Sequence, residues 1–228
     1  MPTTSRLLAS LLLVCGLGGS ALGALSCSGA PAPSAAAPTA PANELLGPEA
    51  FAVVEDREAR SRAMFQEATK VLFHPRCVNC HPSDDSPRQR NLEAHVPPVL
   101  RGPDDRGEVG VRCGSCHQDQ NVELARVPGA PEWHLAPKSM AWIGRSASSV
   151  CAQIKDRARN GNKTLAQIAE HAAHDPLVAW GWKPGADRAP APGTQARFGA
   201  LVAAWIETGA ECPPEAPQET SGPEEARR

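Results

Sequence analysis

Aromatic side chains are scarce in this chain of 228 residues, which has no tyrosine, four phenylalanines and five tryptophans. Neither sign of charge is in excess, since 23 lysines and arginines stand against 25 aspartates and glutamates. This balance argues against a nucleic-acid-binding protein, which needs a clustered basic surface. By contrast, 23 prolines and 19 glycines predict long loops. A loop-rich domain with so few large side chains has a small core, and it usually needs a disulfide, a metal or a large cofactor for stability.

The N-terminus has the pattern of a secretion signal. One basic residue, Arg6, precedes an apolar stretch over residues 7–25 that is diluted by glycines. The stretch ends in the sequence ALSC, residues 24–27, which resembles a bacterial lipobox, although a larger aliphatic residue is more usual in place of its alanine. We therefore expect a lipoprotein-type signal peptide over residues 1–26 and a lipid on Cys27. An ordinary cleaved signal peptide and an uncleaved anchor are the alternatives.

Two segments lack the composition of a folded core. Residues 27–46 are rich in alanine and proline and predict a semi-extended tether. Residues 213–228 are rich in proline and glutamate and predict a disordered tail. The folded domain is therefore expected over residues 47–212, held by the lipid on the periplasmic side of a bacterial membrane. A soluble periplasmic protein is the alternative.

Two sequences in this domain have the CxxCH pattern that attaches haem covalently. They are Cys77-Val78-Asn79-Cys80-His81 and Cys113-Gly114-Ser115-Cys116-His117. In each, two thiols three residues apart can add to the two vinyl groups of one haem, and the histidine can bind the iron as its proximal ligand. A redox-active CxxC usually belongs to a βαβ unit, and a Cys₄ zinc site does not need a histidine after each pair. The sequence therefore predicts two covalently bound haems c.

The distance between the motifs indicates one compact di-haem domain. Only 31 residues, 82 to 112, separate the first motif from the second. This is too short for a second cytochrome domain in series. The two haems are therefore expected to lie close enough for fast electron exchange.

Each motif is followed by a histidine that is a candidate sixth ligand of an iron. His95 has a proline two residues later and His134 has one three residues later, and proline limits how far each histidine can retract. The leading hypothesis is two bis-histidine haems with His95 and His134 as distal ligands, each in its own unit or crossed between units. Met140 is the alternative distal ligand for one iron, where it would raise the potential. Otherwise these side chains are ordinary loop or core residues.

Apolar periodicity and capping residues predict a mostly α fold, and no alternating run predicts a convincing strand. The expected helices span residues 48–74, about 148–160, 164–175 and 194–208. His171 and His174 lie in the last turn of the third helix, where the helix dipole favours a cation. His74 is better explained by a helix end than by a ligand role. The expected fold is a loop-rich, cytochrome c-like domain with few or no strands.

Two of the eight cysteines are left for a disulfide. Cys15 lies within the signal, Cys27 is the expected lipid site, and four belong to the motifs. Cys151 and Cys212 remain as an even pair in an oxidising compartment, which favours a bond between them. Such a bond would tie the C-terminal helix to the domain, and two separate buried thiols are the alternative.

Three stretches together carry a family resemblance. They are HPRCVNCHP from His74, WHLAP from Trp133 and WGWKPG from Trp180. Between about residues 73 and 213 the chain resembles small bacterial c-type cytochromes that are often labelled "isoquinoline 1-oxidoreductase subunit". The resemblance implies electron transfer, with an exported molybdenum hydroxylase as a possible partner. The chain itself has no cysteines for [2Fe–2S] clusters and no molybdopterin domain, so the label would describe the partner.

The sequence favours an electron carrier over an enzyme. Two six-coordinate haems leave no iron position open for a substrate. A di-haem peroxidase needs an open iron and an acid/base group, and the known ones resemble two full cytochrome domains. A small-ligand sensor also needs an open iron. We therefore expect a membrane-tethered periplasmic di-haem cytochrome c that exchanges electrons with redox partner proteins and has no catalytic residues.

Overall fold

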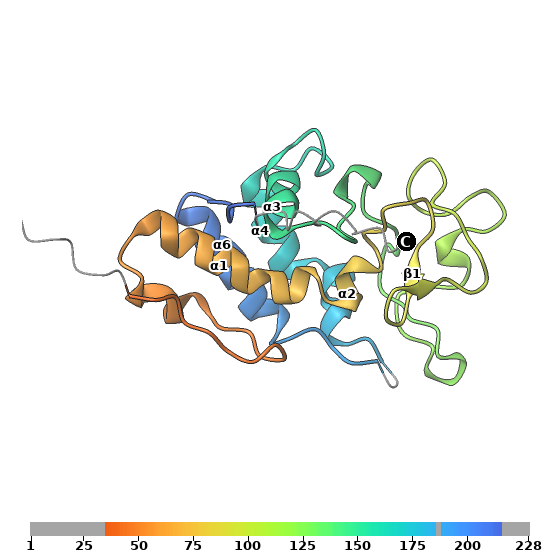
Figure 1. Ribbon diagram of the computed structural model, residues 1–228. Coiled ribbons are helices and arrows are strands. Elements are labelled where there is room, and N and C mark those ends of the chain that lie inside the picture. The colour runs from red at the N-terminus through yellow and green to blue at the C-terminus, as the bar shows by residue number, and fades with distance from the viewer. Residues whose placement is uncertain (1–34, 186–187, 216–228) are drawn as a thin grey trace, which may run out of the picture. The chain divides into compact units, whose positions relative to one another are not determined.

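The computed structural model describes residues 35–185 and 188–215, which belong to one unit of the chain. The expected signal peptide, the lipid site at Cys27 and residues 216–228 of the expected tail lie outside this part. The described unit is mostly helical and rich in loops, with few strands, as predicted (Figure 1). None of its helices has the length and apolar character needed to cross a bilayer.

The first expected helix is two helices in the structure. Pro48–Val53 form a 3₁₀ helix, η1, and the α-helix α1 spans Arg57–Leu72. Val54 between them is extended, and the Asp56 carboxylate accepts a hydrogen bond of 2.7 Å from the Ala59 N–H. This N-cap starts a new helix, so the prediction of one continuous helix was wrong.

The other elements follow along the chain as short helices and one small hairpin. They are α2 (Pro75–Val78), β1 (Arg88–Gln89), β2 (Glu93–Ala94), η2 (Cys113–Ser115), η3 (Glu123–Ala125), η4 (Lys138–Met140), α3 (Ala147–Lys155), α4 (Leu165–His174), α5 (Pro176–Ala179), η5 (Trp180–Trp182) and α6 (Gln195–Glu207). β1 pairs antiparallel with β2, and this is the only sheet within the described residues.

Helices α4 and α6 begin where their capping residues predict. The Thr164 hydroxyl accepts from the Gln167 N–H at 3.2 Å, and the Gln167 side chain accepts from the Thr164 N–H at 2.9 Å. This is the predicted capping box of α4. The Thr194 side chain caps α6 in the same position. Both helix starts are therefore local properties of the sequence.

Helix α3 ends five residues before its expected end at Asn160. The Ala158 N–H donates to the Asp156 carboxylate at 2.9 Å instead of continuing the helix. The side chain of Asn160 takes its place and donates to the Ile154 carbonyl oxygen at 2.7 Å. These side chains compete with the backbone for the same hydrogen bonds, which ends the helix.

The core lies where α6 packs on both α1 and α4. The two long helices α1 and α6 run side by side in Figure 1. The apolar face of α6 is buried, and Trp205 in its last turns is 1% exposed. Its ring lies 4.9 Å from the ring of Phe65 on α1, measured between centroids. The apolar face that the periodicity predicts for this helix is therefore the surface along which α6 packs on α1.

The packed unit begins earlier than the expected boundary at residue 47. Leu45 is only 5% exposed and belongs to the core. The Leu46 N–H donates to the Glu67 carboxylate at 2.9 Å, and the Lys70 ammonium donates to the Ala40 carbonyl oxygen at 2.9 Å. The last residues of the expected tether therefore lie against α1.

The disulfide between Cys151 and Cys212 is confirmed. It joins α3 to the segment after α6, with the two Cα atoms 5.6 Å apart and a sequence separation of 61. Cys151 is fully buried. The bond therefore ties the C-terminal end of the described unit to its core.

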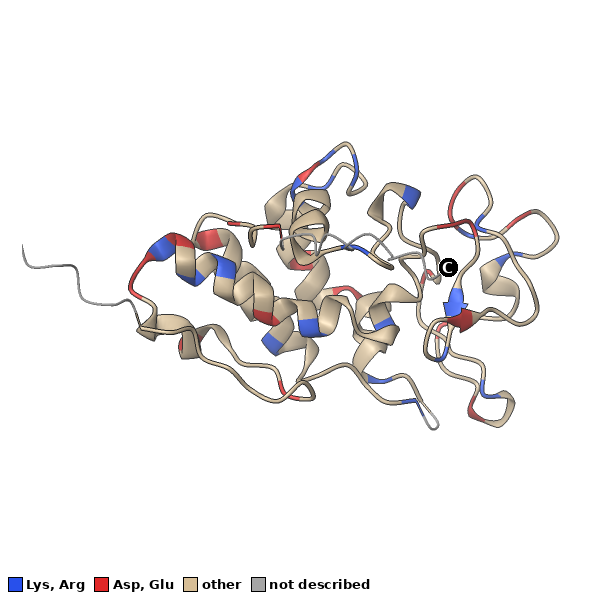
Figure 2. Cartoon of the chain, viewed as in Figure 1, with Lys and Arg blue, Asp and Glu red and all other residues tan. Residues whose placement is uncertain are grey.

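Charged side chains of both signs are interspersed over the helices and the loops. Figure 2 shows no large region of a single sign in this view. The residues from 82 to about 135 form a separate group of loops beyond α2, away from α1. The first CxxCH motif immediately precedes this group of loops in the chain, and the second lies within the group.

Candidate haem-binding sites

A large cavity lies among the helices, and the first CxxCH motif forms part of its wall. The cavity has a volume of about 180 Å³ and is partly open to solvent. Most of its lining is apolar, and α1, α4, α5 and α6 all contribute to it. This lining fits a flat and apolar group.

The two thiols of the first motif line this cavity and are not joined to each other. Cys77 lies in α2 and Cys80 follows it, and both are free. Burial raises the pKa of Cys77 to about 12 and that of Cys80 to about 11. Redox-active CxxC pairs need a lowered thiol pKa, so these thiols do not fit that chemistry. His74 caps α2 by accepting from the Arg76 N–H at 3.3 Å, in agreement with its assignment to a helix end.

His81 is held in the manner of a metal-binding histidine. Burial lowers its pKa to about 3, so the ring is neutral at physiological pH. Its Nδ1 lies 2.8 Å from the Met140 carbonyl oxygen, to which the neutral ring donates. Trp142 stacks on the ring with 3.4 Å between centroids. The hydrogen bond fixes the ring and leaves Nε2 for a metal, which is the usual outer-shell arrangement of such ligands.

Met140 is placed as an anchor of His81. Its carbonyl oxygen accepts from Nδ1 and therefore lies behind the ring, on the side away from Nε2. Its side chain is 6% exposed, belongs to the core cluster and also lines the cavity. The structure therefore gives Met140 a role as the anchor of His81 and as a core residue.

The second motif repeats this arrangement in a more open place. His117 has its Nδ1 2.7 Å from the Pro128 carbonyl oxygen, and Trp133 stacks on it with 4.5 Å between centroids. Burial lowers the pKa of His117 as well. Cys113 is half-buried, whereas Cys116 is exposed. Sequence reasoning missed the stacked tryptophans and the carbonyl partners of both histidines, because neither is adjacent to its motif.

His95 lies opposite the histidine of the second motif. The ring centroids of His95 and His117 are 6.0 Å apart and the rings are inclined by 62°. The Nδ1 of His95 is 2.8 Å from the Pro97 carbonyl oxygen, so its Nε2 is available. Two imidazoles that share one metal have centroids about 6 Å apart, because each metal–nitrogen bond is about 2 Å long. His95 therefore lies beside the histidine of the second motif, which is the arrangement that the crossed pairing predicts.

His134 is also placed beside the other motif. It lines the cavity that contains Cys77, Cys80 and His81. Its Nδ1 is hydrogen-bonded to the Glu132 carbonyl oxygen within its own turn. The same cavity wall contains His171, which the sequence assigned only to a helix end. Two histidines are therefore available to the first motif from different elements.

Two tryptophans connect the sites. Trp133, which stacks on His117, meets Trp180 edge-on with 5.0 Å between centroids. Trp180 lines the cavity of the first motif, and its Nε1 donates to the Asn121 side-chain oxygen at 3.0 Å. An aromatic contact chain therefore runs from one candidate site to the wall of the other.

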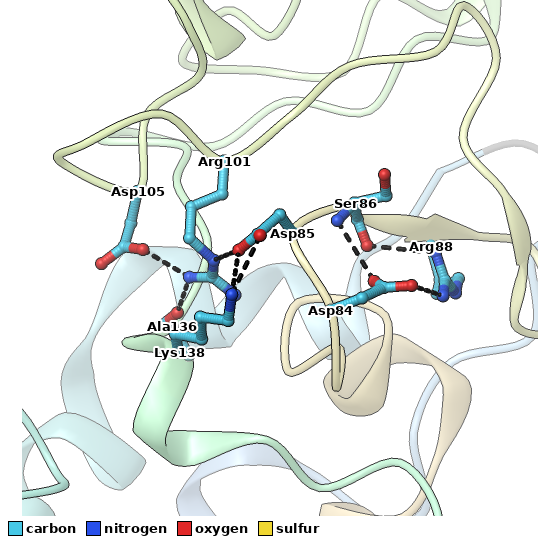
Figure 3. Close-up of polar contacts among 8 residues, drawn as sticks. All are labelled: Asp84, Asp85, Ser86, Arg88, Arg101, Asp105, Ala136 and Lys138. Carbon is cyan, nitrogen blue, oxygen red and sulfur yellow. Dashed lines mark hydrogen bonds and ion pairs between the residues drawn. The ribbon is translucent and has the colours of Figure 1, made fainter.

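A buried arginine holds the loops that carry the two motifs (Figure 3). Arg101 is 7% exposed, and its Nη1 donates to the Asp105 carboxylate and, at 2.6 Å, to the Ala136 carbonyl oxygen. Its Nε lies 3.6 Å from the Asp85 carboxylate, which also pairs with Lys138 at 2.8 Å. The cluster therefore joins the loop after the first motif to the loop before the second and to the segment that anchors His81.

Replacing Arg101 by methionine is expected to lower the free energy of unfolding by about 2 kcal/mol, because the carboxylates and the carbonyl oxygen lose their buried donor. Arg88→Met is the matched control. Its ion pair with Asp84 lies nearer the surface (2.5 Å, with the aspartate 54% exposed), so it should cost less than about 1 kcal/mol. Denaturant unfolding followed by circular dichroism measures both, and equal losses would contradict the structural role of Arg101.

No group of three or more histidine, cysteine, aspartate or glutamate side chains in residues 35–185 and 188–215 is arranged to hold a metal ion unaided. The four motif thiols therefore do not meet as the Cys₄ zinc site that was the alternative to haem. The chain matches no protein-family model, and no curated protein or solved structure is significantly similar to it.

Proposed function

We propose that this chain is a di-haem c-type cytochrome that transfers electrons. One haem would be attached to Cys77 and Cys80, and the other to Cys113 and Cys116. The observation that carries the proposal is the repeated setting of the two motif histidines. Each ring is hydrogen-bonded through Nδ1 to a backbone carbonyl and stacked on a tryptophan, which leaves Nε2 for iron.

The lining of the first site fits haem. Two thiols, a neutral imidazole and many apolar side chains line the same cavity. The cavity lies among the helices that form the hydrophobic core. Trp142 lines the same cavity, and its buried Nε1–H has no hydrogen-bond partner among the described residues. A polar edge of a bound group, such as a haem propionate, would provide that partner.

Electron transfer suits the arrangement better than catalysis. Haem supplies a reversible one-electron couple when it is bound. The protein residues would then fix the ring positions, surround the first site with mostly apolar side chains, and link both sites through Trp133 and Trp180. A histidine stands opposite the ring of His117, and others line the cavity of His81, so each iron would have a candidate sixth ligand within the chain.

The setting of this carrier follows from the sequence. We propose that it belongs to the small bacterial cytochromes that it resembles and that it works on the periplasmic side of a membrane, anchored by lipid on Cys27. Its redox partner would be an exported oxidoreductase such as a molybdenum hydroxylase.

The full chain, produced with a c-type haem maturation system, should contain two covalent haems, and both should be low-spin in the ferric state. Pyridine haemochrome absorbance and intact mass give the number of haems per chain, and visible and EPR spectra give the spin state. Chain produced without the maturation system is the control and should carry no covalent haem. One haem per chain would contradict the di-haem assignment. A high-spin ferric signal, or rapid CO binding to most of the ferrous haem, would contradict electron carriage.

A further inference from the structure

Helix α4 presents one face to the cavity of the first motif. Ile168, His171 and Ala172 all line this cavity, and they are separated by three and four positions, which places them on one side of a helix. His174 lies on another side, where it is 70% exposed and its Nδ1 is 3.0 Å from the Glu170 carboxylate. The two histidines that close α4 are therefore not equivalent, because only His171 lines the cavity with His81.

The ring of His171 is oriented by a carboxylate. Its Nδ1 lies 2.9 Å from Oδ2 of Asp175, which leaves Nε2 as the nitrogen available to a metal. Asp175 is itself held, because its Oδ1 accepts from the Leu177 N–H at 2.8 Å as the cap of α5. A carboxylate on the far nitrogen of a histidine is a frequent feature of metal sites.

His171 and His81 are 90 positions apart in the sequence (171 minus 81) but face the same space. Both rings line this cavity from different elements, His171 from α4 and His81 from the segment after α2. His81 is held from behind by Met140, so its Nε2 is directed away from that carbonyl.

The rival groups on the cavity wall are less well placed. Met140 is behind His81, as described above. His134 is hydrogen-bonded within its own loop turn, and the residue before it, Trp133, stacks on the histidine of the second site. Lys163 belongs to the turn before α4. Among these groups, only His171 is positioned both by a helix and by a fixed carboxylate.

We propose that His171 is the sixth ligand of the haem iron at the first motif, and that Asp175 is its positioning residue. This inference rests on the proposed function and deepens it. It replaces His134 as the distal ligand of that iron. It leaves His95 as the ligand opposite His117.

His171→Ala in the full holoprotein should convert one of the two ferric haems to high spin, while the number of haems per chain stays at two. His174→Ala and His134→Ala are the matched controls and should leave both haems low-spin. Added imidazole should return the His171→Ala protein to fully low-spin, which shows that the site is folded and lacks only a ligand. EPR and visible spectra measure these states.

Several outcomes separate this inference from the proposed function. If His134→Ala creates the high-spin haem and His171→Ala does not, the ligand is His134 and the inference is overturned, whereas electron carriage stands. Two low-spin haems in the His171→Ala protein without imidazole also overturn it. A high-spin haem in the unaltered protein would instead defeat the proposed function.

Asp175→Asn tests the positioning role. The amide can still cap α5, but it no longer gives a charged partner to Nδ1 of His171, so the ligand becomes less basic. Both haems should stay low-spin and the reduction potential of only one should rise, as measured by spectroscopic redox titration. Unchanged potentials of both haems would show that Asp175 does not act through His171.

Discussion

Replacing Cys77 and Cys80 together by alanine is expected to remove one covalent haem and to prevent the chain from folding into a stable unit. The same double replacement at Cys113 and Cys116 should also remove one haem but leave the unit folded. The difference follows from where the motifs lie. The first pair lines the cavity among α1, α4 and α6, whereas Cys116 in the second pair is exposed.

The expected size of the first effect comes from the core. Buried side chains of α1 and α6 such as Phe65, Phe198 and Trp205 form the cavity wall, and they would face about 180 Å³ of unfilled space without a bound group. Empty apolar cavities are destabilising by roughly 24 cal/mol per Å³. The loss should therefore be about 4 kcal/mol, which approaches the whole stability of many domains.

Haem content per chain and thermal unfolding by circular dichroism test this prediction on both double variants. The second-motif variant should keep one haem and a cooperative transition. The first-motif variant should show a broad transition or none. Equal melting behaviour of the two variants would mean that the group in the cavity is not part of the core.

Removing the disulfide should cost about 4 kcal/mol of unfolding free energy. The bond between Cys151 and Cys212 closes a loop with a sequence separation of 61. In the chain-entropy description, such a loop restricts the unfolded state by about 4 kcal/mol. The folded state changes less, because the Lys155 ammonium still donates to the Ala210 carbonyl oxygen and the Trp205 Nε1–H to that of Glu211.

The double variant Cys151→Ala/Cys212→Ala measures this effect by denaturant unfolding. Reduction of the unaltered protein is the matched comparison, since it opens the disulfide and leaves thioether-bound haem attached. Both samples should lose a similar amount of stability. A loss below about 1 kcal/mol would contradict the prediction, because the unfolded chain would then not be restricted by this bond.

Local interactions explain the parts of the fold that the sequence predicted well. The capping box of Thr164 and Gln167 starts α4, and Thr194 starts α6, because these side chains act on N–H groups within three residues. The same kind of interaction explains an error. Asp56 caps α1 and divides the expected first helix. The composition of the expected helix gives no sign of this division.

For the candidate sites, what the sequence predicts is clearly separate from what only the structure shows. Residue types and spacing alone single out the thiols and the histidines of the two motifs, because the proposed haem attachment would act within five consecutive residues. The disulfide partners follow from counting cysteines. Neither argument needs a three-dimensional structure, because both depend on covalent reach or on the compartment.

Only the tertiary structure decided which histidine stands opposite which motif. His95 follows the first motif in the chain but lies 6.0 Å from the ring of His117, and His171 looks like a helix-dipole residue until α4 is packed over the cavity. The reason is physical: a distal ligand is defined by the face of a helix or loop that packing turns toward the iron. Periodicity reveals that α4 has two sides, but the packing of α6 on α4 and α1 determines which side meets His81.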